Sequence, residues 1–146
     1  MRPTDLEGSG LFDRKAPTLA AGGLVWNERN GSVKIALVKQ KNDGLWHLPK
    51  GKYSPKDKSL KQAAIREVRE ETGCDVKVSG FADSLRYRAG KKNKIVLFWH
   101  MKLRKPKAFK LHDDIVKFRW FTPDKAAEKL GCRDEKRLLI EQLPNS

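Results

Sequence analysis

The chain contains 146 residues, of which 34% are charged and 38% are apolar, a size and composition that fit one soluble globular domain with its own core. Only two cysteines are present, so a disulfide-dense scaffold is excluded and we expect a reducing, cytoplasmic setting. The longest strongly apolar run, residues 95–99, is far below the ~20 residues that cross a bilayer. The formal net charge of +14 favours a polyanionic partner such as nucleic acid, anionic lipid or a polyphosphorylated small molecule, or else reflects only a solvated basic surface.

The N-terminal third of the chain predicts an arm followed by a β-hairpin. Residues 1–16 mix glycine, proline and charged side chains without periodicity, which is typical of a flexible arm, and we expect a single ordered domain over residues 17–146. Residues 19–26 and 33–38 are apolar and rich in strand-forming side chains, and the Asn-Gly pair between them is a hairpin signal. Residues 45–52 are dense in chain breakers and basic side chains, which indicates a functional loop or a kinked edge strand.

The clearest helix of the sequence follows this segment. Ser59, with Gln62 three residues later, matches a capping box, and small or apolar side chains then recur every four residues. Gly73 stands where a helix-ending glycine belongs. The pattern predicts a helix over Leu60–Thr72.

The rest of the chain predicts further strands and two short helices. Strands are expected over residues 76–79, 81–87, 95–103 and 115–121, with a basic turn over residues 91–94. Thr122 followed by Pro123 predicts a helix start, and a terminal helix is expected from Asp134 onward. Hairpin-linked strands with a helix inserted between them indicate a mixed α/β fold.

Three glutamates crowd one side of the predicted helix. At 100° per residue, Glu67 and Glu71 lie about 40° apart, and Glu70 lies about 60° to the other side of Glu67. Like charges at this spacing repel, and acids at the C-terminal end of a helix oppose its dipole. A divalent cation such as Mg²⁺, which prefers oxygen ligands, would resolve both conflicts. The alternative is a solvated surface helix whose acids pair with Arg66 and Arg69.

These residues, together with an upstream glycine, resemble a known motif. Gly51 and residues 66–74, Arg-Glu-Val-Arg-Glu-Glu-Thr-Gly-Cys, are similar to the Nudix box, G-x5-E-x7-R-E-U-x-E-E-x-G-U, in which U is a bulky apolar residue. The likeness extends to residues 20–26 before the box and 118–121 after it, and so covers most of the chain.

The first half of the box departs from the family's pattern. One extra residue lies between Gly51 and Arg66, and because Ser59 keeps its expected distance from Arg66, the insertion falls in the preceding loop and leaves the helix register intact. The position of the usual first glutamate is then taken by Lys58 or by the shorter Asp57. We expect metal binding to persist, with weaker anchoring of the loop.

The resemblance implies both a fold and a chemistry. The fold is a Nudix-type α/β/α sandwich with a mixed β-sheet and a catalytic loop-helix-loop, and the reaction is hydrolysis of a nucleoside diphosphate linked to another group. The resemblance implies that Glu67 and Glu71 are ligands of Mg²⁺, with Mn²⁺ as a substitute. It implies that Glu70 is a further ligand or the catalytic base, and that Arg66 orients the carboxylates. Related enzymes sometimes use a base outside the box, for which the candidates are Asp113 and Asp114. For the last two, a merely solvated acidic turn is the alternative.

Substrate binding is expected in the basic segment before the helix. Residues 46–52, Trp-His-Leu-Pro-Lys-Gly-Lys, look like those of Nudix hydrolases that act on diadenosine or diphosphoinositol polyphosphates, which implies that Lys50, Gly51 and Lys52 meet phosphates near the metal. A second basic cluster surrounds a predicted hairpin and is expected to close over the same site: Arg86, Arg88, Lys91, Lys92 and Lys94. For each of these side chains the alternative is a solvated basic surface without a ligand.

Three functions remain open at this point. The leading hypothesis is a Mg²⁺-dependent pyrophosphohydrolase that cleaves a diphosphate linkage in a dinucleoside polyphosphate such as diadenosine tetraphosphate, or in a similar polyanionic small molecule. The alternatives are removal of pyrophosphate from RNA 5′ ends or from damaged nucleoside triphosphates, and a nucleic-acid-binding module on a weakly active Nudix fold. The intact acidic half of the box argues against a pure binding module, because a binder has no need of crowded carboxylates.

Overall fold

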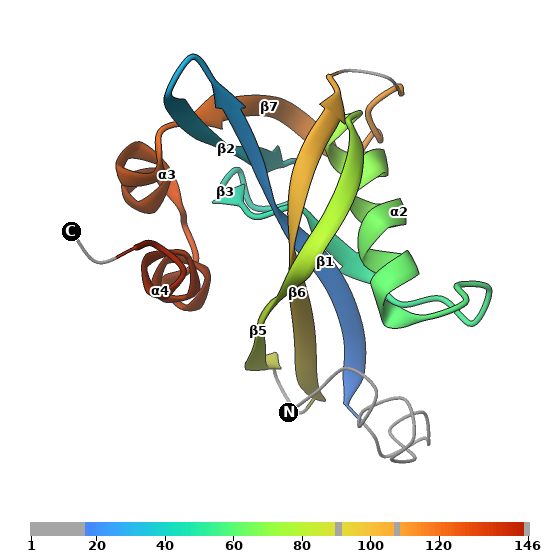
Figure 1. The fold of residues 1–146 in the computed structure, drawn as a ribbon. Helices are drawn as coiled ribbons and strands as arrows, with labels where there is room; N and C mark the ends of the chain where they lie inside the picture. Colours follow the sequence, from blue (N-terminus) through green and yellow to red (C-terminus); the bar gives the residue numbers. More distant parts are fainter. Residues whose placement is uncertain (1–16, 90–91, 107–108, 145–146) are drawn as a thin grey trace.

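The computed structural model describes residues 17–89, 92–106 and 109–144, so the arm expected over residues 1–16 lies outside the described part of the chain. In the described ranges, seven strands form one mixed sheet with helices on both of its faces (Figure 1). The strands are β1 Thr18–Arg29, β2 Ser32–Gln40, β3 Trp46–His47, β4 Lys50–Lys52, β5 Asp75–Ala89, β6 Lys92–Lys105 and β7 Ile115–Phe121. The helices are α2 Leu60–Thr72, α3 Pro123–Lys129 and α4 Arg133–Glu141.

Strand β1 is the centre of the sheet. It runs parallel to β6 on one edge, and on its other edge it pairs antiparallel with β4 near its start and with β2 near its end. Strand β5 pairs outside β6, while β3 and β7 pair with β2. The mixed α/β fold expected from the sequence is therefore confirmed.

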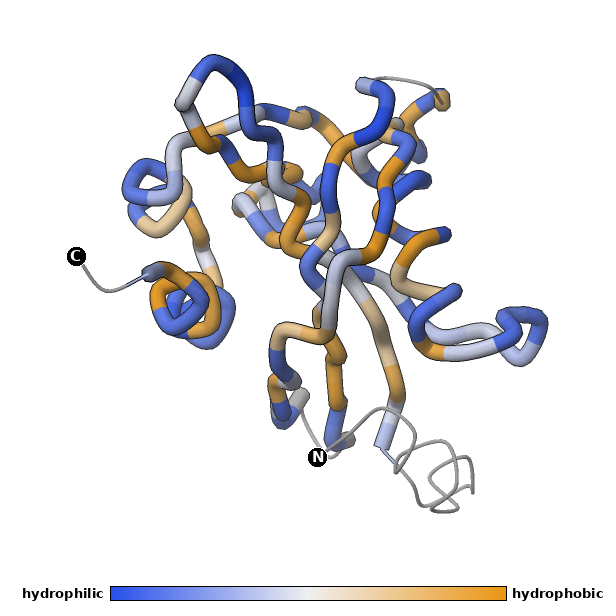
Figure 2. Tube along the Cα trace, in the orientation of Figure 1, coloured by the Kyte–Doolittle hydropathy of each residue, from blue (hydrophilic) through white to orange (hydrophobic). Residues whose placement is uncertain are grey.

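Side chains of β1 alternate between two cores. Ala21 and Val25 point toward α2, whereas Ala20 and Leu24 point toward α3 and α4, as the period of two in a strand requires. In Figure 2 the tip of the β1–β2 hairpin and the loop before α2 are hydrophilic, while apolar stretches follow the central strands. No helix in the described ranges is both long and apolar enough to span a membrane.

The ends of α2 follow the local signals in the sequence. The Ser59 hydroxyl accepts a hydrogen bond from the backbone N of Gln62 at 3.1 Å. Gly73 adopts a left-handed backbone, φ 71°, and its N–H donates to the carbonyl of Arg69. The predicted helix Leu60–Thr72 is thus confirmed at both ends.

Several strand predictions need correction. For residues 45–52 the second of the two expected alternatives is found, because β3 and β4 form there as short edge strands. The segments expected at 76–79 and 81–87 belong to one strand, β5, whose register against β6 shifts at bulges that a hydrophobic pattern does not reveal. The basic turn expected over 91–94 is shorter, since β6 begins at Lys92; residues 90–91 lie outside the described ranges.

Candidate active site

Strand β4 lies close against one side of α2. Gly51, in the middle of β4, pairs with Ala21 of β1 and therefore faces the same side of the sheet as α2. A Cβ atom added to Gly51 would overlap the carboxylate of Glu67. The glycine thus lets the strand backbone approach the acidic side chain more closely than any other residue would.

Glu71, one turn after Glu67, is the most buried acid of the helix, with 9% of the residue exposed. The backbone N of Lys50 donates to its Oε1 at 3.0 Å, and Gln40 Nε2 donates to its Oε2 at 3.4 Å. Burial raises the pKa of Glu71 to about 7; the hydrogen bonds from Lys50 and Gln40 oppose the shift, and the negative charge of Glu67 adds to it. Burial also raises the pKa of Glu67, against the attraction of Arg66.

Arg66 joins the loop before the helix to the acidic side chains. Its Nε and Nη2 each donate to one carboxylate oxygen of Asp57 at 2.8 Å, and its Nη1 donates to Glu67 Oε1 at 2.8 Å and, at 3.4 Å, to Glu70. Nη2 also donates to the carbonyl of Lys52 at 3.1 Å. Of the two residues expected at the position of the usual first glutamate, Asp57 is therefore the one that pairs with Arg66.

Replacing Asp57 by asparagine is expected to lower the free energy of unfolding by about 1–3 kcal/mol, because a charged two-pronged pair becomes a neutral contact. Arg66 holds the pKa of Asp57 below its ordinary value of 3.8. The stabilisation is therefore present above pH 3.8 and is lost as the pH falls through the depressed pKa. Urea unfolding of wild type and variant between pH 7 and pH 3 measures the difference.

The exposed neighbour Lys58 provides the control for this substitution. Lys58→Gln is expected to change the unfolding free energy by no more than about 0.5 kcal/mol. An equal loss in both variants, or a loss from Asp57→Asn that persists unchanged at pH 3, would contradict the role given to the Asp57–Arg66 pair.

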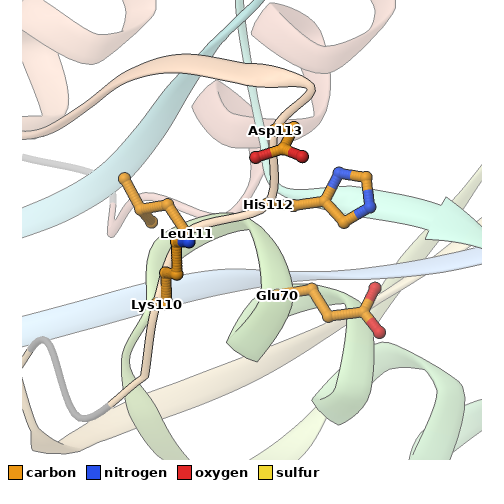
Figure 3. Close-up of a pocket in the computed structure, with 5 residues that line it drawn as sticks. All are labelled: Glu70, Lys110, Leu111, His112 and Asp113. Atoms are coloured by element: carbon orange, nitrogen blue, oxygen red, sulfur yellow. The ribbon is translucent and has the colours of Figure 1, made fainter.

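The third glutamate opens onto a surface pocket of about 290 Å³. Glu70, with 42% of its side chain exposed, lines the pocket with Lys110, Leu111, His112 and Asp113 from the β6–β7 connection. In Figure 3 the side chains of Glu70 and His112 extend in the same direction, while Lys110 and Leu111 lie on the other side. The backbone N of His112 donates to the carbonyl of Glu70 at 2.8 Å, which fixes the loop beside the helix. Sequence reasoning gave no role to His112.

The acidic residues fit a hard divalent cation. In the described part of the chain, no group of three or more His, Cys, Asp or Glu side chains is arranged to hold an ion. However, the carboxylates of the half-buried Glu67 and the buried Glu71 lie one helical turn apart. Mg²⁺ is typically held by one or two carboxylates, with water and substrate phosphates completing its shell. Their raised pKa values indicate carboxylates that a cation would help to keep ionised.

The opposite face of β4 carries basic side chains. Lys50 and Lys52 pair with Gly22 and Ala20, which places their side chains on the face of the sheet covered by α4. Lys94 of β6 lies on the same face, and burial together with the charges of Lys50 and Lys52 lowers its pKa. The structure therefore brings Lys50, Lys52 and Lys94 into one cluster across β4 from the glutamates.

The arginines of β5 do not join this cluster. Arg86 and Arg88 alternate with Leu85 and Tyr87, which pack toward α4, so their side chains lie on the other face of the sheet. Lys91 and the side chain of Lys92 lie outside the described part of the chain. The basic residues expected to close over one site are thus divided between two faces.

Comparisons with known proteins identify the family and agree with the fold. The NUDIX domain family matches residues 16–143. The asymmetrical bis(5′-nucleosyl)-tetraphosphatase of Sus scrofa is 31% identical over 135 residues, 84% of this chain and 90% of that protein, and its counterpart in Mus musculus is 29% identical over 119 residues, 77% and 80%. A crystal structure of a C. elegans Ap4A hydrolase binary complex matches with a TM-score of 0.75 and 25% identity over 85% of this chain and 93% of that chain.

The chain therefore shares its fold with a hydrolase of solved structure, and it belongs to the NUDIX family. It is a Nudix hydrolase, an enzyme that acts on phosphorus-containing acid anhydrides.

Proposed function

We propose that this enzyme is a Mg²⁺-dependent pyrophosphohydrolase that cleaves a diphosphate linkage in a dinucleoside polyphosphate such as diadenosine tetraphosphate. The observation that carries the proposal is the position of β4, a three-residue strand with the glutamates on one side and a lysine cluster on the other. A long polyphosphate chain that crosses this strand meets cationic side chains at one end and the acidic site at the other. The similarity to asymmetrical tetraphosphatases supports the same substrate class.

In this proposal Glu67 and Glu71 hold the metal, and Glu70 is a further ligand or the base. When bound, Mg²⁺ would neutralise charge on the phosphate oxygens and make an attacking water more acidic. Arg66 restrains Glu67 and reaches Glu70, so the acidic side chains keep their places before substrate arrives. Water forms a bond to phosphorus, the bridging oxygen leaves, and the water's proton passes to Glu70 or to Asp113, which faces the same pocket.

A substrate panel assayed with Mg²⁺, and again with Mn²⁺, tests the proposal. It contains diadenosine polyphosphates, 8-oxo-dGTP, CTP, diphosphoinositol polyphosphates and RNA with a 5′-triphosphate. We expect the highest kcat/KM for diadenosine tetraphosphate and loss of activity in EDTA. A preference for 8-oxo-dGTP would favour the function named for a relative from Mycolicibacterium smegmatis, which is 26% identical over 129 residues, 82% of this chain and 39% of that protein. RNA binding without phosphate release would favour a binding module.

We propose that the enzyme acts in the cytoplasm. The two cysteines, Cys74 and Cys132, are unpaired, which is consistent with the reducing cytoplasm. We also propose that residues 17–146 form a single catalytic domain. Limited proteolysis tests the second point, since one stable fragment close to this range is expected.

A further inference from the structure

The backbone N–H and the side-chain ammonium of Lys50 are each hydrogen-bonded to a glutamate. Its backbone N donates to Glu71 in the acidic site, while its Nζ, on the other face of the sheet, donates to Glu135 Oε2 at 3.0 Å. The Glu135 side chain is 1% exposed and the Lys50 side chain is 13% exposed. Burying two charges carries a large desolvation cost, which only good geometry and further hydrogen bonds offset. This pair is therefore a built feature of the fold and differs from an ordinary surface ion pair.

Glu135 has three donors that fix its orientation. Besides Lys50, the backbone N of Leu48 donates to its Oε1 at 2.6 Å, and Nδ1 of His47 lies 3.1 Å from its Oε2. The other ring nitrogen of His47 lies 2.7 Å from Asp43 Oδ2, so both nitrogens face carboxylates. Burial lowers the pKa of His47, but Glu135 and Asp43 outweigh it and the pKa is raised, as expected for a ring that donates on both sides.

The helix that carries Glu135 is itself anchored in the core. Leu138 and Leu139, three and four residues further along α4, are fully buried against the sheet. Glu135 lies on the same side of the helix, because residues three and four apart share a face. The carboxylate is therefore held by the packing of α4 as well as by its hydrogen bonds.

We infer that Glu135 is a positioning residue for polyphosphate binding, which holds the Lys50 ammonium beside Lys52 and Lys94 so that all three act on one phosphate chain. The inference rests on the proposed function. Burial lowers the pKa of Lys94, and the positive charges of Lys50 and Lys52 lower it further, so the three ammonium groups repel one another. Without a carboxylate among them, Lys50 would turn toward bulk solvent and would have to be immobilised again at each binding event.

Glu135 affects phosphate binding in two opposite ways, and the change in Kd on removing its charge shows which effect is larger. A carboxylate 3.0 Å from Lys50 Nζ weakens the pull of that ammonium on an anion, whereas fixing the side chain in advance strengthens binding. If neutralisation dominated, removing the charge of Glu135 would tighten phosphate binding. If positioning dominates, as we infer, removing it weakens binding.

The test compares Glu135→Gln with wild type by titration calorimetry, using adenosine 5′-(β,γ-methylene)triphosphate in EDTA so that no metal contributes. We expect Kd to rise about tenfold, and KM for diadenosine tetraphosphate to rise by a similar factor while kcat changes less than about twofold. Glu141→Gln, an exposed acid on the same helix, is the matched control and is expected to leave Kd and KM unchanged. An unchanged or lower Kd in Glu135→Gln would overturn the inference.

A double-mutant cycle with Lys50→Met separates positioning from a general loss of structure. If Glu135 acts through Lys50, Glu135→Gln adds less than about twofold to Kd when Lys50 is already absent. A full tenfold loss in both backgrounds would show a structural role and would contradict the inference. If the glutamine variant unfolds, Glu135→Asp provides the same comparison, because it keeps the charge but shortens the side chain. We expect a raised Kd in this variant, and an unchanged Kd would contradict the inference.

The two proposals fail in different ways. If wild type hydrolyses nothing in the substrate panel, the proposed function fails, while the calorimetric comparison still measures phosphate binding at Lys50. If wild type is active but Glu135→Gln behaves like Glu141→Gln, only the inference about Glu135 fails.

Discussion

Replacing Glu71 by glutamine is expected to lower kcat by on the order of 10²-fold or more while the fold stays intact. Glutamine has nearly the same shape, and its oxygen can accept the hydrogen bond from the Lys50 backbone, with Gln40 turning its own amide to match the new partner. An amide is nevertheless a much weaker ligand for Mg²⁺ than a carboxylate, because it carries no net charge. The loss should therefore fall on catalysis and leave packing unaffected.

The same substitution should stabilise the metal-free protein above neutral pH. Burial raises the pKa of Glu71 to about 7, so ionising this side chain disfavours the folded state. The stability of the wild type therefore falls as the pH rises from about 4.5 through 7, whereas the glutamine variant has no such charge to ionise. A gain in stability together with a loss of activity is the signature of a residue retained for function.

Thermal unfolding in EDTA at pH 5 and pH 8, with kcat at saturating Mg²⁺, measures both halves of this prediction. Glu128→Gln, an exposed acid on α3, is the control and should change neither quantity. Near-full activity of Glu71→Gln would contradict the metal-binding role. A variant less stable than wild type at pH 8 would contradict the assigned burial cost.

How far the sequence predicts this molecule depends on how local each signal is. The bounds of α2 follow from Ser59 and Gly73, which act on their own helix ends, and the crowding of the glutamates follows from helical period alone. Strands β3 and β4 have two and three residues, too few for a hydrophobic period, and they exist because their backbones pair with β2 and β1. The bulges of β5 are likewise set by its partner strand.

Within the candidate site, the positions of the basic residues likewise depend on partners that are distant in the sequence. Lys94 and Arg86 are close in the predicted hairpin, but the register of β5 on β6 decides which face of the sheet each one occupies. The pairing of Lys50 with Glu135 joins positions 85 residues apart, which no single-sequence pattern predicts. One local signal was available: Glu135 stands three and four residues before Leu138 and Leu139, so it lies on the apolar side of its helix, where an unpaired acid would be costly.

Replacing Gly51 by alanine is expected to lower kcat/KM by about 10²-fold and the free energy of unfolding by about 1–3 kcal/mol. The added Cβ would overlap the Glu67 carboxylate, which must then move away from β4 or push the strand outward. Gly51 is not among the described glycines with positive φ, so the effect is steric and does not arise from backbone strain. The first movement displaces a proposed metal ligand, and the second moves the Lys50 N–H that donates to Glu71.

Gly80→Ala is the matched control, since a Cβ at this glycine of β5 meets nothing within 4 Å and Gly80 also lacks a positive φ. It should leave both activity and stability near wild-type values. Urea unfolding and steady-state kinetics on both variants give the comparison. Full activity in Gly51→Ala would mean that the contact between β4 and Glu67 is not needed for catalysis, and it would remove the main structural reason for a glycine at the start of the box. A loss confined to Gly51→Ala would instead tie the glycine to the acidic site, because both substitutions add the same methyl group to a strand of the same sheet.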